Sequence, residues 1–182
     1  VIDANHNGYP EIFVTRMNNV QQRVSSQIME YNGSAYVVQK REYPWYFNVI
    51  SDPEGQDILL AQVHNKKGPW KSARVFKAVW EGSNYSLGDK FRVPKENFSV
   101  LSMARGRASG DEQKGFALYT DQNGRLTQLS VDTGKIEWTS DEGHGGSDLY
   151  YDIPATEANA MYHVKHIYFQ PQSNFFDMDE DG

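Results

Sequence analysis

Short strand-like runs recur along almost the whole 182-residue chain. The runs are rich in β-branched and aromatic residues, and turn sequences such as NGS, DPEGQ, QNG and DTG separate them. In one run, Phe76, Ala78 and Trp80 fall on one face of a strand and Lys77 falls on the other. Helical periodicity is poor, so the sequence predicts an all-β fold. We expect twelve strands, at 11–16, 26–32, 34–42, 45–51, 57–64, 73–82, 85–93, 98–105, 115–121, 125–132, 135–141 and 163–170.

The expected strands fall into three groups of four, which begin near Glu11, Asp57 and Gly115. Each group opens with a short apolar run (IFV, ILLA or FALY), which is typical of a strand buried on both faces. Repeated four-stranded units of about 40–60 residues indicate a β-propeller. A β-sandwich or an irregular all-β domain is the alternative. The expected blades are 11–56, 57–114 and 115–182.

The number of expected blades indicates whether the chain can close into a complete propeller. Closed propellers use about 4–8 blades, and we count three. An open stack would expose the apolar faces of its terminal blades, which are usually covered by something. We therefore expect this chain to be part of a longer propeller or to associate with itself.

Composition narrows the class of function. The chain has no cysteine, which excludes disulfides and thiolate chemistry. A net charge of −6 and a pI near 5.3 argue against a nucleic-acid partner. No apolar run approaches the roughly 20 residues that a membrane-spanning helix needs.

The stretch DANHNGYPE places short oxygen-bearing side chains at every second position. Asp3, Asn5 and Asn7 alternate, Gly8 follows, and Glu11 comes immediately before the run IFVT. Glycine permits a tight turn that a side chain would obstruct. The pattern predicts a curled loop that leads into a strand.

This stretch resembles the FG-GAP/VCBS repeats of integrin-α-like propellers, in which D-x-D-x-D-G-x-x-D/E precedes a buried strand. DANHNGYPEIFV follows the motif, with asparagine replacing aspartate at Asn5 and Asn7. The final residues, FFDMDEDG, are similar to the beginning of the same motif. The segment GRLTQLSVDTGKIEWTSD resembles a quinoprotein-type propeller repeat instead.

Calcium suits such a loop because it takes six to eight oxygen ligands at about 2.3–2.6 Å. Val14 stands where an EF-hand would carry its bidentate glutamate, so the loop is not an EF-hand. We expect the loop to deliver the innermost strand of a blade. The alternative is an Asx-rich turn without an ion. The expected Ca²⁺ ligands are Asp3, Asn5, Asn7, the Tyr9 carbonyl and Glu11, with a second, truncated set at Asp177, Asp179 and Asp181.

Catalytic and zinc sites are not expected. Ser147, His144 and Asp148 are close in sequence, but adjacency is not the geometry that a catalytic triad requires. His163 and His166 are three apart in an expected strand, so they point to opposite faces and cannot share a zinc ion. The tryptophans are expected to fill space between blades.

These observations together favour a noncatalytic, calcium-stabilised propeller segment that presents a surface to a protein or carbohydrate ligand. A cell-surface adhesin would share this chemistry. The family resemblance implies an extracytoplasmic, bacterial setting. The alternative, implied by the quinoprotein-like segment, is part of a pyrroloquinoline quinone dehydrogenase.

Overall fold

The computed structural model describes residues 2–18, 23–51, 56–65, 72–95, 97–108, 111–144, 150–152 and 166–168. These residues contain strands and one short 3₁₀ helix, η2 (Val100–Ser102), and no α-helix. No helix in the described ranges is both long and apolar enough to cross a membrane. The strands are β1 (Glu11–Val14), β2 (Met17–Asn18), β3 (Arg23–Val24), β4 (Ser26–Tyr31), β5 (Tyr36–Tyr43), β6 (Trp45–Ser51), β7 (Asp57–Val63), β8 (Val75–Trp80), β9 (Tyr85–Phe91), β10 (Ala104–Ala108), β11 (Asp111–Thr120), β12 (Arg125–Ser130), β13 (Ile136–Gly143), β14 (Tyr150–Asp152) and β15 (His166–Tyr168).

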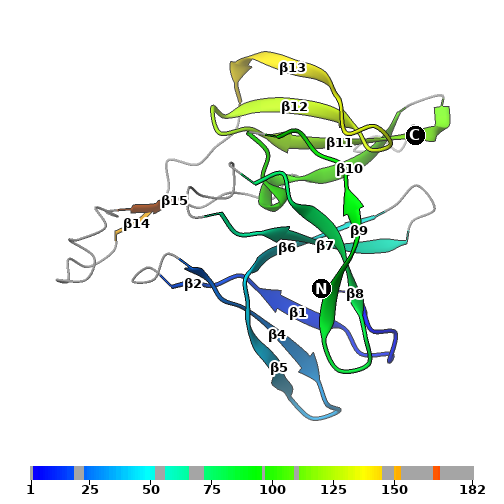
Figure 1. The fold of residues 1–182 in the computed structure, drawn as a ribbon, viewed down its shortest axis with the longest axis vertical. Coiled ribbons are helices and arrows are strands. Elements are labelled where there is room, and N and C mark those ends of the chain that lie inside the picture. The colour runs from blue at the N-terminus through cyan, green and yellow to red at the C-terminus, as the bar shows by residue number, and fades with distance from the viewer. Residues whose placement is uncertain are drawn as a thin grey trace.

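Three larger sheets follow one another along the chain (Figure 1). Two have four strands, in the orders β6-β7-β8-β9 and β10-β11-β12-β13, and the first has three, in the order β1-β4-β5. Every pairing within them is antiparallel. The strand pairs β2-β3 and β14-β15 are separate. The prediction of an all-β fold is confirmed, and the consecutive sheets resemble neighbouring blades.

The sheets divide the chain one strand earlier than the sequence predicted. β6 was expected to end the first group, but it pairs along its whole length with β7, from Trp45 opposite Val63 to Ser51 opposite Asp57. The third sheet likewise begins with β10, which pairs with β11. β7 and β11 are therefore second strands. Their apolar runs arise because they lie in the interior of a sheet, with a strand on either side.

In the first sheet, Ile2 occupies the position next to β1. Its backbone N–H and C=O both bond to Glu11, at 3.3 and 2.8 Å. Both backbone groups of a strand residue point to one side, so this bridge lies on the edge of β1 that faces away from β4. Ile2 thus stands where β6 and β10 stand in their sheets. β1 is nevertheless the edge strand of its sheet, with the single Ile2 bridge on its outer side.

The middle sheet, β6–β9, contributes side chains to two hydrophobic cores. Tyr46 and Ile50 of β6, with Leu60 of β7, join the core shared with the third sheet. Phe47 and Leu59, which alternate with them, join the core shared with the first sheet. The period-two alternation of a strand therefore buries both faces of this sheet and stacks all three sheets.

Buried polar side chains connect the middle sheet to the segment that enters the third. The Gln62 amide donates to the carbonyls of Ser72, at 2.8 Å, and Phe98, at 3.3 Å, and its oxygen accepts the Val100 N–H at 3.0 Å. Asn48 donates to the carbonyls of Val100, at 2.7 Å, and Met103, at 2.8 Å. These bonds satisfy backbone groups of Ser72 and of the segment around η2 that no neighbouring strand pairs with.

We predict that Gln62→Leu lowers the free energy of unfolding by about 3 kcal/mol, because buried backbone groups lose their partners. Urea unfolding followed by tryptophan fluorescence measures the change. Gln128→Leu is the matched control, since this amide makes one exposed bond to Glu137; it should change stability by less than about 0.5 kcal/mol. Equal effects of the two substitutions would contradict the role given to Gln62.

Candidate functional site

The loop between Ile2 and β1 curls around the Asp3 carboxylate. Its two oxygens accept the backbone N–H groups of Asn7, at 3.0 Å, and Gly8, at 2.9 Å. Gly8 has a φ of 87°, a backbone conformation that favours glycine. The sequence pattern therefore gives the tight turn that was expected of it.

The two asparagines of the loop also turn inward. The Asn5 side-chain oxygen accepts the Asn7 N–H at 3.1 Å, and the Asn7 oxygen accepts the Tyr9 N–H at 2.8 Å. Their side-chain amide nitrogens point toward β4. Both donate to Oε1 of Glu30, and the Asn5 bond is 3.3 Å long. The loop is thus joined to the neighbouring strand through its asparagines.

Glu11 and Glu30 lie directly opposite each other in the β1–β4 ladder. Both are buried, with exposed fractions of 1% and 8%. Because Glu11 uses its backbone bonds for Ile2, this is a non-hydrogen-bonded pair, in which side chains approach most closely. Like charges in that position destabilise a sheet unless something compensates them.

The Glu11 carboxylate is only partly satisfied by the protein. Its Oε2 accepts the Ala4 N–H at 2.8 Å, whereas its Oε1 is buried and makes no hydrogen bond of normal geometry within the described structure. Burial raises the Glu11 pKa most, and the nearby charges of Glu30 and Asp3 raise it further, while backbone N–H groups alone lower it. Among the residues that the structure describes, no positive charge stabilises the ionised form.

The Tyr85 hydroxyl in β9 is a further polar group that interacts with Glu11. It too is buried and has no hydrogen bond of normal geometry. Its pKa is raised first by burial, then by the charge of Glu11 and by a side-chain hydrogen bond to that carboxylate, so the two groups are each other's partners in less than ideal geometry. The base of the loop therefore holds two partly unsatisfied buried oxygens.

The residues present fit a calcium ion in their chemistry. Asp3, Glu11 and Glu30 are oxygen donors of the kind that Ca²⁺ takes, and the asparagine oxygens are a second kind. Among the described residues, no group of three or more His, Cys, Asp or Glu side chains is already placed to hold a metal ion. Amide and carbonyl oxygens would have to complete the shell, as the predicted ligand set already requires.

The structure brings together Asp3, Asn5, Asn7 and Glu11, as the sequence predicted, and puts Tyr9 beside them. Asp177, Asp179 and Asp181 lie outside the described residues, as do Ser147 and Asp148. Glu30 was missed. Its signal is present in the strand SQIMEY, where Ser26, Ile28 and Glu30 alternate on the buried face; an acidic residue at an inward position requires a partner.

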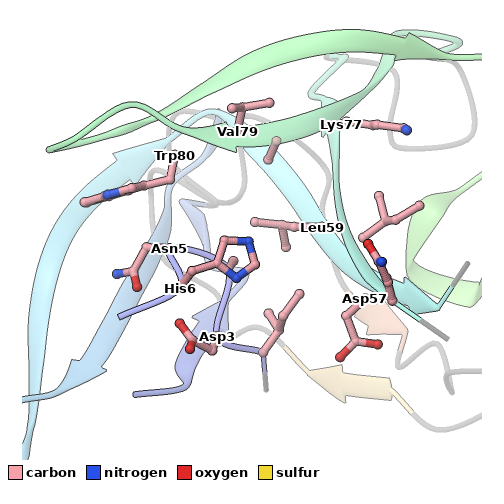
Figure 2. A pocket seen from close by; sticks show the side chains of 13 residues that line it. Asp3, Asn5, His6, Asp57, Leu59, Lys77, Val79 and Trp80 are labelled. Atoms are coloured by element: carbon pink, nitrogen blue, oxygen red, sulfur yellow. The ribbon is translucent and has the colours of Figure 1, made fainter. Parts of the chain in front are cut away.

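On its other side the loop lines a cavity of about 660 Å³. Figure 2 shows Asn5 and His6 of the loop facing Trp80 and Val79 of β8 across Leu59. Lys77 and Asp57 lie toward the opposite end and Asp3 lies on the loop side, so the lining is apolar in the middle and charged on both sides of it.

A row of three tyrosines runs beside the loop. The rings of Tyr9 and Tyr31 are 5.9 Å apart, and those of Tyr31 and Tyr36 are 5.5 Å apart. Tyr9 and Tyr36 are 45% and 40% exposed. Trp138, expected between blades, is half exposed on β13, whereas Trp45 and Trp80 pack against the core between the first two sheets.

Comparison of this chain with protein-family models, curated proteins and solved structures found no match. The site is therefore interpreted from its own geometry.

Proposed function

We propose that this chain is a noncatalytic, propeller-type segment in which calcium at Asp3–Glu11 stabilises the first sheet and the neighbouring surface binds a protein or glycan. The observation that carries the calcium assignment is Glu11 Oε1, a buried carboxylate oxygen at the base of an oxygen-rich loop that makes no hydrogen bond of normal geometry, the Tyr85 hydroxyl being a poorly aligned partner. Such an atom costs about 1–3 kcal/mol unless something satisfies it.

The proposed ligands from the loop are Asp3, Asn5, Asn7, the Tyr9 carbonyl and Glu11. When bound, calcium would supply the positive charge that the clustered carboxylates lack and would hold the turn against the start of β1. Weak sites of this kind fill where calcium is millimolar, which agrees with a bacterial protein outside the cytoplasm.

The ligand-binding part of the proposal is supported by the tyrosine row and by the adjacent cavity. Tyrosine rings combine an apolar face with a polar edge, a combination that suits the C–H faces and hydroxyl groups of sugars. Because Tyr9 belongs to the loop itself, calcium would also fix the position of this surface.

We predict that about 10 mM calcium raises the melting temperature by about 5–10 °C relative to a chelator, the effect of a ligand at about a hundredfold excess over its dissociation constant. Differential scanning calorimetry measures the shift. Asp3→Ala should abolish it, whereas Asp89→Ala, an exposed aspartate in β9, should preserve it. Identical melting of the unaltered chain in calcium and chelator would refute the calcium assignment.

For the surface, we predict that the chain binds members of a glycan array in calcium and that the double variant Tyr9→Ala/Tyr36→Ala loses this binding without changing its circular dichroism. Trp138→Ala, which removes an exposed ring on the distant strand β13, is the control and should bind as before. Unchanged binding by the double variant would remove the tyrosine row from the proposal, and an array without any binding would remove the glycan.

A further inference from the structure

We propose that Glu30 of β4 is itself a calcium ligand, so that the ion joins the loop, β1 and β4. This inference rests on the calcium site proposed above and adds to it a residue from a different strand, nineteen positions beyond Glu11 in the sequence. A site confined to the loop would fix a turn, whereas a site that includes Glu30 would hold the sheet together.

The ladder register supports this placement. Glu30 stands directly opposite Glu11, and both side chains are almost completely buried. Two acidic groups adjacent in a protein interior repel each other and lose hydration, both of which are unfavourable. A divalent cation between them reverses the sign of the interaction.

The poorly satisfied Oε1 of Glu11, which has no hydrogen bond of normal geometry and only the Tyr85 hydroxyl as a poorly aligned partner, is a further indication. Buried polar atoms in folded proteins almost always have a partner, so each exception calls for an explanation, and a bound ion is one. The other oxygen of this carboxylate bonds to Ala4 in the loop, which directs the group toward the space that the loop encloses.

The amides of Asn5 and Asn7 give Glu30 hydrogen-bond donors from the loop. Asn5 and Asn7 both direct N–H groups at the same oxygen of Glu30, the position at which a cation would otherwise act. An amide carries donors on one end and an acceptor on the other. Calcium would replace these donors at Glu30 and leave the asparagine oxygens available as ligands.

Including Glu30 raises the number of charged ligands in the proposed site. Asp3 and Glu11 give the loop two carboxylates, and Glu30 would bring the number to three once an ion draws together side chains that are not already grouped as a metal site in the described residues. Calcium affinity increases with the number of charged ligands and with the rigidity of the site. A ligand in a paired strand adds both, since β4 lies between β1 and β5.

Isothermal titration of the full chain with calcium chloride tests this proposal, with Glu30→Gln as the main variant. We expect its calcium affinity to fall by about tenfold or more, the scale on which metal sites lose affinity when a supporting group is removed. Glu137→Gln is the matched control, an exposed glutamate that bonds only to Gln128 among the described residues, and should bind calcium as the unaltered chain does.

Glu30→Asp provides a second variant that keeps the charge and withdraws the oxygens by one methylene. It should also bind calcium more weakly, because a ligand must reach the ion, whereas a charge that acts only at a distance would leave the affinity unchanged. Hydrogen exchange adds a structural readout: calcium should slow exchange of the β4 amides in the unaltered chain and not in either variant. Circular dichroism in chelator checks that each variant is folded.

The outcomes separate the two proposals. Unchanged affinity in both Glu30 variants, with loss of binding in Asp3→Asn, would overturn the role of Glu30 and leave the loop site intact. Absence of calcium binding in the unaltered chain would overturn both. Reduced affinity in Glu30→Gln and Glu30→Asp, with normal affinity in Glu137→Gln, would establish Glu30 as a ligand.

Discussion

The alternation of side chains in the middle sheet is the constraint on which the arrangement of the other sheets depends. Tyr46 and Phe47 are neighbours in sequence, yet one enters the core with the third sheet and the other the core with the first. A shift of register by one residue would exchange the two sets of side chains. Since both faces are buried, neither set can tolerate polar residues without partners, and Gln62 is accommodated through its bonds to backbone groups.

The candidate site is an exception to this apolar packing, at the edge of the first sheet. Glu11 begins β1 and Glu30 lies one residue before the end of β4, so the ladder brings two acidic groups together where the polar loop closes. The loop then provides N–H donors: Ala4 for Glu11, and the amides of Asn5 and Asn7 for Glu30. This compensation is incomplete, because one oxygen of Glu11 has no hydrogen bond of normal geometry and only a poorly aligned Tyr85 hydroxyl beside it. The calcium proposal follows from that deficit.

Features determined by neighbouring residues were predictable from the sequence. Strand positions follow from alternation and turn residues, and the curl of DANHNGYPE follows from side chains that bond to backbone groups two to five residues away. Features determined by the pairing of strands were not predictable from the sequence. The apolar runs of β7 and β11 could not reveal that β6 and β10 precede them in the same sheets. Glu30 was missed because its relation to Glu11 depends on the register between β1 and β4, although its inward position in SQIMEY was visible.

A crystal structure of the chain grown in millimolar calcium tests most directly whether an ion completes this site. The account predicts an electron-density peak about 2.3–2.6 Å from oxygens of Asp3, Glu11 and Glu30, with the side-chain oxygens of Asn5 and Asn7 turned toward it. Replacing calcium by a lanthanide should give an anomalous signal at the same position. The contradicting result is a site without an ion at that calcium concentration, with both asparagine amides still donating to Glu30.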